Sequence, residues 1–260
     1  MEKMKITLVQ FRRRPLAEEN IWTAISLAKN EKSDLIIFSE NWLSSRAINL
    51  DDYIYYIEKI GNILDSNILG GIQYVNESDS IKSVGISYIN RKPVRICEKI
   101  NPSKAVGERE ILAGGKYIAP IKVYDWKIGC IACVDIFYPE ISRLHAINMA
   151  DIIYNPASIS GESVKLWHSV LQTRAAENVV YSIGVNNTNT MYPDQRITAG
   201  ESVVFNPHGD KILELGSEDT AITVSLDYDY FDFVNRRWAF REDLINKYSN
   251  IYKSFFKENN

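Results

Sequence analysis

Short apolar runs alternate with segments of helical periodicity along most of the chain, and this alternation constrains the fold more than any other feature. Residues 5–11 read as a strand, and residues 34–38 form a continuous apolar run, as expected of a strand buried on both faces. Between them, residues 18–30 carry apolar side chains on one helical face, with Glu18 and Glu19 in the first turn. The sequence therefore predicts a mixed α/β protein whose helices cover one or both faces of a sheet.

The same criteria extend this alternation to residue 227. Further helices are predicted around 54–64, from Pro139 to about Ala150, and over 162–178. Strands are predicted over 68–75, 151–155, 179–186 and 221–227, as hairpins over 84–98 (turn Asn90 to Pro93) and 201–215, and as a pair over 119–134 (turn at Asp125 and Trp126). Because no linker, repeat or low-complexity stretch interrupts the pattern, residues 1–260 are expected to form a single domain.

Composition excludes several function classes. The formal net charge of −3 provides no broad basic surface, so nucleic acid is not expected as a partner. No apolar run approaches the roughly 18 residues that a membrane span needs. The opening MEKMKITLVQF lacks the apolar core and cleavage site of a signal peptide, so the expected location is the cytoplasm. An odd count of 3 cysteines argues against a disulfide framework and leaves a functional thiol open.

Three predicted strands end in chemically useful side chains. Residues 34–38 lead to Glu40, the hairpin strand ending in RICEK delivers Lys99, and KIGCIACV brings Cys133 to a strand end ahead of the helix at Pro139. The carboxyl ends of strands in α/β sheets are frequent ligand sites. Backbone N–H groups and a helix N-terminus near the thiol favour the thiolate. A carboxylate, an ammonium and a thiol together indicate an active site, whereas each alone is more often a structural residue.

Two other chemistries fit the cysteines and histidines less well. Cys130 and Cys133 form a C-x-x-C pair, but Ile and Ala separate them within a strand pattern, which does not favour a redox motif. His145, His168 and His208 are scattered without metal-ligand spacing, so no metal site is predicted.

The segment from Gly129 to Glu140 resembles the nucleophile motif of the carbon–nitrogen hydrolase (nitrilase and amidase) superfamily, in which Gly precedes Cys-x-Asp and then Phe-x-Glu or Phe-Pro-Glu. Tyr138 makes the tail of the motif one residue longer here. Glu40 matches the glutamate of the family's first motif, although Ser39 replaces the usual proline. Lys99 stands where the family has its lysine.

Further landmarks of the family follow in order between about residues 5 and 237. They are Gln10, the run Arg174-Ala-Ala-Glu177-Asn178, Asn186, Gly200-Glu-Ser202 and Asn206-Pro207-His-Gly209. The resemblance implies a four-layer α-β-β-α sandwich of the nitrilase type. It also implies a homodimer or a higher even assembly. The aromatic tail, Tyr248, Tyr252, Phe255 and Phe256, would pack either on a partner subunit or on its own core.

By resemblance, Cys133 attacks the carbonyl carbon of an amide, and Glu40 serves as base and then as acid. Lys99 and the backbone N–H of Val134 stabilise the oxyanion. This cycle uses water and needs no metal or cofactor. An accessory glutamate is expected at Glu108 or Glu110.

Arg174, in the late helical motif, is an accessory residue that either touches substrate or holds the fold. Asp135 is expected to make local structural hydrogen bonds.

The expected substrate is a small non-peptide amide or N-carbamoyl compound. Nitrilases of the superfamily typically carry Cys-Trp-Glu at the nucleophile, whereas this chain has Cys133-Val134-Asp135. Nitrile hydrolysis and a catalytically silent binding protein remain alternatives. Arg46, Lys104 and Arg109 near the expected pocket suggest a substrate that carries a carboxylate.

Overall fold

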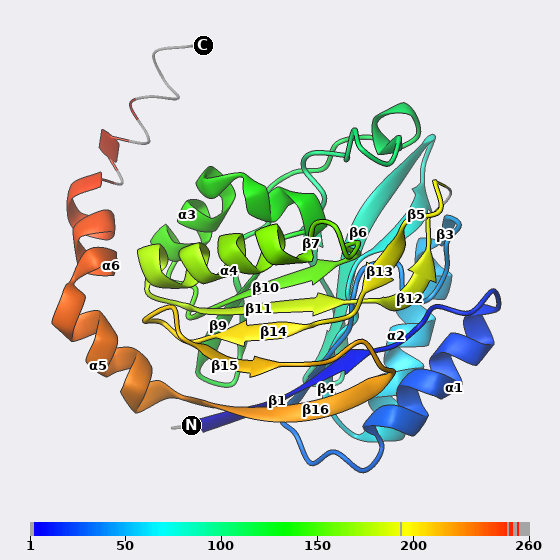
Figure 1. Ribbon diagram of the computed structural model, residues 1–260, viewed down its shortest axis with the longest axis horizontal. Helices are drawn as coiled ribbons and strands as arrows, with labels where there is room; N and C mark the ends of the chain where they lie inside the picture. The colour runs from blue at the N-terminus through cyan, green and yellow to red at the C-terminus, as the bar shows by residue number, and fades with distance from the viewer. Residues whose placement is uncertain (1–2, 193, 249, 252–253, 255–260) are drawn as a thin grey trace.

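Two β-sheets lie face to face, with helices on the outer side of each, in the computed structural model of the protein (Figure 1). The structure describes residues 3–192, 194–248, 250–251 and 254. The first sheet contains β1 (Lys3–Gln10), β2 (Leu35–Ile37), β3 (Ile48–Asn49), β4 (Asn67–Leu69), β5 (Gln73–Glu77), β6 (Ser80–Ile89), β7 (Lys92–Glu98) and β16 (Thr220–Asp227). Its order is β16-β1-β2-β4-β6-β5-β3, and β7 pairs with β6.

The second sheet has the order β15-β14-β11-β10-β9-β8. Its strands are β8 (Ile121–Val123), β9 (Trp126–Cys130), β10 (Ile152–Ala157), β11 (Tyr181–Asn186), β14 (Val203–Phe205) and β15 (Lys211–Glu214). A separate hairpin consists of β12 (Thr188–Met191) and β13 (Ile197–Ala199).

Helices α1 (Ala17–Ala28) and α2 (Leu50–Leu64) cover the first sheet, and α3 (Pro139–Ile147) and α4 (Val164–Asn178) cover the second (Figure 1). This arrangement confirms the four-layer α-β-β-α sandwich. Helices α5 (Tyr228–Trp238) and α6 (Phe240–Asp243) then run along the edge of the molecule. Among the described residues, no helix is both long and apolar enough to cross a membrane.

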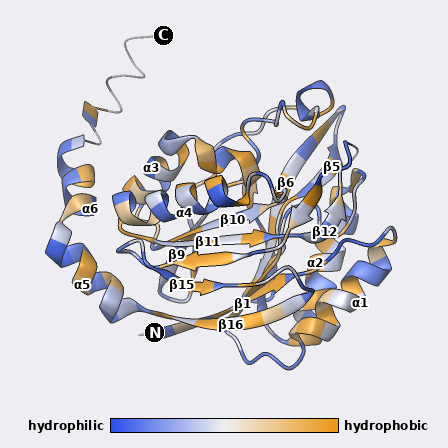
Figure 2. Ribbon diagram, viewed as in Figure 1, coloured by the Kyte–Doolittle hydropathy of each residue, from blue (hydrophilic) through white to orange (hydrophobic). Residues whose placement is uncertain are grey.

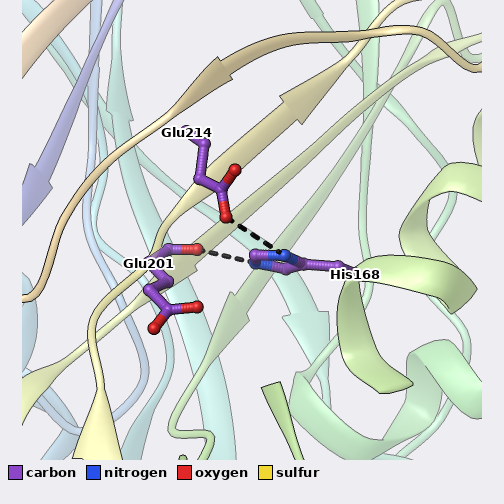
Figure 3. A group of neighbouring side chains, drawn as sticks. All are labelled: His168, Glu201 and Glu214. Atoms are coloured by element: carbon purple, nitrogen blue, oxygen red, sulfur yellow. Dashed lines mark hydrogen bonds and ion pairs between the residues drawn. The ribbon is translucent and has the colours of Figure 1, made fainter. Parts of the chain in front are cut away.

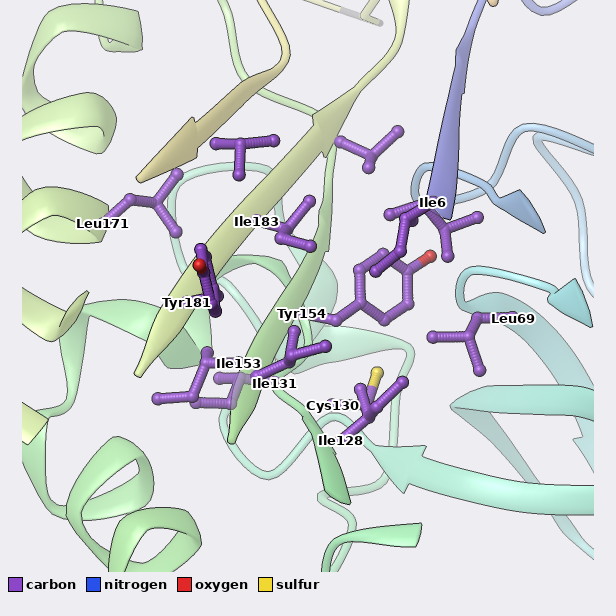
Figure 4. Close-up of a cluster of buried hydrophobic side chains, with 14 of the residues drawn as sticks. Ile6, Leu69, Ile128, Cys130, Ile131, Ile153, Tyr154, Leu171, Tyr181 and Ile183 are labelled. Carbon is purple, nitrogen blue, oxygen red and sulfur yellow. The ribbon is translucent and has the colours of Figure 1, made fainter. Parts of the chain in front are cut away.

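The buried strand β2 shows why the layers form. Leu35 and Ile37 point into the core between the sheets, whereas Ile36 and Phe38 pack beneath α1 and α2. The chain must therefore place apolar groups on both sides of this strand, which explains its continuous apolar run. Figure 4 shows the core between the sheets, where Ile6 and Leu69 of the first sheet face residues of the second. Figure 2 shows hydrophobic stretches in the strands of both sheets.

Four sequence predictions about secondary structure are wrong. Residues 68–75 form two strands, because Gly70 and Gly71 interrupt the run and Gly71 adopts a φ of 78°. Strand β9 ends at Cys130, so Cys133 does not lie on a strand. The turn before β9 lies at Tyr124 and Asp125, and the hairpin turn before β7 lies at Asn90 and Arg91 alone.

Several elements were not predicted, namely β3, the β12–β13 hairpin and the C-terminal helices α5 and α6. In the aromatic tail, the side chain of Tyr248 is exposed, and Tyr252, Phe255 and Phe256 lie outside the described residues.

Candidate active site

Glu40 lies where the two sheets meet. It follows β2, and its backbone N–H donates to the carbonyl oxygen of Ala157 at the end of β10 (3.3 Å). Asn187 holds the same point, because its amide donates to the Glu40 carbonyl oxygen (2.6 Å) and accepts from the Ser39 hydroxyl (2.7 Å). A Cβ at Gly71 would lie 2.0 Å from the Ser39 carbonyl oxygen, so only glycine fits there. The carboxylate of Glu40 is thus fixed in a buried position, 3% exposed.

Lys99 joins two carboxylates in the interior. Its Nζ donates to Glu40 Oε1 (2.9 Å) and to Glu108 Oε1 (2.7 Å), and its side chain is 2% exposed. Glu108 is fixed further by the Tyr74 hydroxyl (2.6 Å) and by the backbone N–H of Ser103 (2.6 Å). A buried ammonium is tolerable because its charge is paired and two of its three N–H donors have carboxylate partners.

The structure brings Glu108, and not Glu110, to Lys99. Both residues lie in the short 3-10 helix η1 (Glu108–Glu110), whose first side chain is buried and whose last is exposed. Residues two apart point in different directions on such a helix, so only one of them can face the lysine.

Cys133 begins the 3-10 helix η2 (Cys133–Phe137) with a φ of 41°, a conformation that a residue with a Cβ rarely adopts. The Asn155 amide holds this turn by donating to the carbonyl oxygens of Ile131 (2.6 Å) and Cys133 (3.0 Å). The Cys133 thiol lies next to the Glu40 carboxylate, close enough for each group to affect the pKa of the other. Strain at a single buried residue that contacts a carboxylate is typical of a functional position.

Burial and the neighbouring charges set the protonation of these groups. Burial, followed by the Glu40 carboxylate, raises the pKa of the Cys133 thiol well above its usual range. Burial also raises the pKa of Glu40, and the Lys99 ammonium opposes this rise. Burial works against a high pKa for Lys99, but Glu40, Cys133 and Glu108 outweigh it, so the pKa of Lys99 is raised and the ammonium persists. The resting thiol therefore keeps its proton next to a carboxylate, rather than being the preformed thiolate that the sequence suggested.

The remaining predicted residues lie on the segments that adjoin this centre. Val134 follows Cys133 in the first turn of η2. Asp135 accepts hydrogen bonds from the backbone N–H groups of Ile100 (2.7 Å) and Asn101 (3.0 Å), and so fixes the chain just after Lys99.

Arg174 acts on the far end of η2. Its Nε donates to the Ile136 carbonyl oxygen (3.0 Å), its Nη2 to that of Phe137 (3.3 Å), and its Nη1 pairs with Glu177 (3.0 Å). The guanidinium therefore fixes the backbone that follows Cys133.

Two motif residues from distant segments also meet. The Gln10 side chain donates to the Gly216 carbonyl oxygen (2.7 Å) and accepts from the Ser202 hydroxyl (2.7 Å). The Ser202 hydroxyl also accepts from the Asn186 backbone N–H (3.0 Å), so these residues fix the strands that lead to the site.

Sequence reasoning missed Tyr74, Asn155, Asn187 and Arg13, which lie at or beside the centre. Asn155 directly follows the apolar residues 152–154, a signal that resembles the one used for Glu40.

The cysteines of the C-x-x-C pair have different partners. The thiol of Cys130 lies 3.0 Å from that of Cys97, between the sheets, whereas Cys133 contacts Glu40. All three cysteines are free and buried. The pair Cys130 and Cys133 thus does not form the compact dithiol of a redox motif.

His168, Glu201 and Glu214 form the group that Figure 3 shows, in which one ligand atom from each residue lies within 4.8 Å of the others. The imidazole is already engaged, since Nε2 hydrogen-bonds the Glu201 carbonyl oxygen (2.8 Å) and Nδ1 lies 3.6 Å from Glu214 Oε1. Glu214 also pairs with Lys211. Because both ring nitrogens already have protein partners, the group fits a brace between α4 and β15 better than a metal centre.

The family of the chain follows from comparison with known proteins. The sequence profile named "Carbon-nitrogen hydrolase" matches residues 84–235, more than half of the chain, and these residues include Lys99, Glu108 and Cys133. The chain belongs to the carbon–nitrogen hydrolase family. It is a hydrolase that acts on carbon–nitrogen bonds other than peptide bonds.

Several curated proteins and solved structures are similar to the chain. A protein named "Hydrolase in agr operon" from Staphylococcus aureus is 29% identical over 214 residues, covering 76% of this chain and 79% of that protein. "Omega-amidase NIT2" from Xenopus tropicalis is 23% identical, covering 88% and 91%. A CN-hydrolase superfamily protein from Xanthomonas campestris superposes with a TM-score of 0.86 at 19% identity over 94% and 97% of the two chains. Nit3 from Saccharomyces cerevisiae does so with a TM-score of 0.80 at 22% identity over 91% and 94%. Both structures share the fold.

Proposed function

We propose that the protein hydrolyses a small non-peptide amide or an N-carbamoyl compound through a thioester on Cys133. The observation that carries this proposal is a buried group in which the Cys133 thiol lies next to the Glu40 carboxylate and Lys99 donates hydrogen bonds to both Glu40 and Glu108. A nucleophile next to a base that is itself oriented by a third group is the general signature of covalent catalysis.

In the first half of the reaction, Glu40 takes the thiol proton as Cys133 Sγ attacks the carbonyl carbon. The raised pKa of Cys133 means that proton transfer accompanies attack. Negative charge then develops on the former carbonyl oxygen, and Lys99 and the Val134 N–H stabilise it, at about 3–4 kcal/mol for each donor. Glu40 returns the proton to the departing nitrogen, which leaves as ammonia or an amine, and the thioester remains.

In the second half, water attacks the thioester carbon. Glu40 accepts a proton from this water and gives it to the departing Cys133 sulfur, so the acid product and the free thiol are formed and the carboxylate is restored. One carboxylate therefore serves both halves. Its pKa, raised by burial and restrained by Lys99, suits a group that must gain and lose a proton in turn.

Glu108 and Arg174 act through other residues in this mechanism. Glu108 holds the ammonium of Lys99 in place from the side opposite Glu40 (2.7 Å). Arg174 fixes the carbonyl oxygens of Ile136 and Phe137, and so the turn on which Cys133 stands. Both are positioning residues.

An amide is favoured over a nitrile by the residues after the nucleophile. Asp135 stands where nitrilases typically have glutamate, and its carboxylate accepts backbone hydrogen bonds from Ile100 and Asn101. The similarity to a protein named as an omega-amidase points in the same direction.

A substrate screen tests this function. Purified protein would be incubated with short-chain amides, ω-amides, N-carbamoyl compounds and nitriles, and ammonia release would be measured, with Cys133→Ala as the blank. We expect turnover in the amide or carbamoyl group. Turnover confined to nitriles would support nitrile hydrolysis instead, and no turnover of any compound would support a silent binding protein.

We also propose a homodimer or a higher even assembly. Its support is the set of exposed apolar side chains on the C-terminal helices: Phe233, Trp238, Phe240, Tyr248 and Ile251. A surface this rich in aromatic groups is typical of an interface. Light scattering on the wild-type protein should give a mass at least twice the 29.8 kDa of one chain. The double variant Phe233→Ser/Phe240→Ser should give a lower mass than the wild-type protein. A monomeric wild-type protein would contradict the proposal.

We further propose that the enzyme works in the cytoplasm. The three free cysteines support a reducing compartment, because close thiols such as Cys97 and Cys130 stay reduced there.

A further inference from the structure

Three partly exposed side chains from separate segments stand beside the buried catalytic groups. They are Arg13 in the loop after β1, Tyr74 of β5 and Tyr192 after β12. All three lie within electrostatic range of Glu40, and Tyr192 is also within range of Cys133. The catalytic groups themselves are almost fully buried, so these three partly exposed side chains are placed to meet a molecule that approaches from solvent.

The two tyrosines have their hydroxyl groups occupied. Tyr74 donates to Glu108 (2.6 Å), and Tyr192 donates to the Ser158 carbonyl oxygen. What they offer to a molecule approaching Glu40 is therefore mainly the ring, an apolar wall. Arg13 is different, because it offers charge.

The guanidinium of Arg13 has spare donors. Its backbone N–H donates to the Thr190 hydroxyl (3.0 Å), which fixes the loop, and its Nη1 donates to the Asn41 carbonyl oxygen next to Glu40 (3.0 Å). Within the described part of the chain, Arg13 forms no ion pair with a carboxylate, whereas its neighbour Arg14 pairs with Asp219 (3.3 Å). A guanidinium carries five N–H groups in a planar fork that suits a carboxylate.

Burial lowers the pKa of Arg13, and Tyr192, Tyr74 and Glu40 oppose this change. The cation is thus partly removed from water without a carboxylate of its own, which is costly unless a partner is supplied. The sequence suggested three other cations as partners of a substrate carboxylate. These are exposed to water, unlike Arg13, namely Arg46, Lys104 and Arg109.

We infer that Arg13 binds an anionic group of the substrate, a carboxylate at the end remote from the amide that Cys133 attacks. Nη1 stays on Asn41, and the remaining edge of the guanidinium faces the anion, with the Tyr74 and Tyr192 rings flanking the aliphatic part. This inference rests on the proposed amide hydrolysis and names its substrate class, an ω-amide of a carboxylic acid. It also assigns to Arg13 the selection between charged and neutral amides.

Matched substrates test the assignment. The value of kcat/KM would be measured for glutaramate, which carries a carboxylate, and for pentanamide, which has the same chain length without it. We expect the wild-type enzyme to prefer glutaramate and Arg13→Met to lower the ratio of the two values by ~10- to 100-fold, mainly through KM. Loss of the hydrogen bond from Arg13 to the Asn41 carbonyl oxygen would affect both substrates equally, so a change in the ratio reports recognition of the substrate charge alone. Arg46→Met, which removes an exposed cation nearby, should keep the wild-type ratio.

Binding supplies a second measurement that does not depend on turnover. Calorimetry on Cys133→Ala should detect glutaramate, and Cys133→Ala/Arg13→Met should bind it at least ~10-fold more weakly. A wild-type enzyme that hydrolyses both amides equally, or an Arg13→Met variant that keeps the ratio, overturns the Arg13 inference and leaves the proposed function standing. A wild-type protein that hydrolyses no amide overturns the proposed function, and the calorimetry then decides whether Arg13 recognises the anion.

Discussion

Replacement of Cys133 by alanine is expected to lower kcat for the best amide by at least ~10⁴-fold, because no other group can form the thioester. Cys130→Ala is the matched control. Its thiol contacts Cys97 and does not reach Glu40, so the variant should keep its activity and lose only about 1 kcal/mol of unfolding free energy from lost packing. Both cysteines are buried and lie three positions apart, which makes this comparison specific for the position of the nucleophile.

Trapping gives the direct measurement for this prediction. Rapid acid quenching during turnover, followed by peptide mass spectrometry, should show the acyl group on the peptide that contains Cys133. Because burial and Glu40 raise the pKa of this thiol, fast alkylation at neutral pH is not a suitable criterion for an active enzyme. An inactive Cys130→Ala with an active Cys133→Ala would show that the nucleophile has been assigned to the wrong residue.

Much of the layered fold could be predicted from local pattern. Residues 35–38 are apolar at every position because β2 packs against a core on each face, and residues 18–30 carry the one-sided pattern of α1. Residues 68–75 also look continuous, yet the chain turns at Gly70 and Gly71 because Gly71 must approach the Ser39 carbonyl oxygen. That contact joins distant segments, so no local pattern could indicate it.

The catalytic groups were predicted partly from physics and partly from resemblance. Glu40 follows a central strand, and ligand sites are common at the carboxyl ends of such strands. Cys133 was expected on a strand, but it lies in a turn with a positive φ, and Asn155 of another strand holds that turn through the Cys133 carbonyl oxygen.

The choice of Glu108 over Glu110 depends on how η1 is oriented against Lys99, and a sequence of three charged residues does not specify this. Arg13 was missed because it lies in a run of three arginines, which usually indicates a solvated loop.

The second large effect concerns the charge balance around Lys99. This ammonium lies between the Glu40 and Glu108 carboxylates, and all three side chains are at least 96% buried. Removal of the lysine would leave two carboxylates in a dry site without a cation. Breaking a buried pair in this way costs about 3–5 kcal/mol, since the stranded charge cannot be hydrated.

Lys99→Met is therefore expected to lose ~10³-fold or more in kcat, through its lost oxyanion contact and a disturbed Glu40, and also to unfold at lower denaturant. The stranded carboxyls should have raised pKa values in the folded variant. A raised carboxyl pKa makes stability fall as pH rises, so the stability difference from wild type should be small near pH 4 and largest near pH 7. Denaturant titrations at several pH values would measure it.

A double variant separates stability from catalysis at this site. Lys99→Met/Glu108→Gln removes one of the two stranded charges, so it should recover much of the lost stability while remaining inactive. Glu110→Gln, at the exposed end of η1, should change neither property and serves as the control. A stability loss in Lys99→Met that is independent of pH, or that Glu108→Gln does not relieve, would mean that the lysine acts through packing rather than as the cation that balances the two carboxylates.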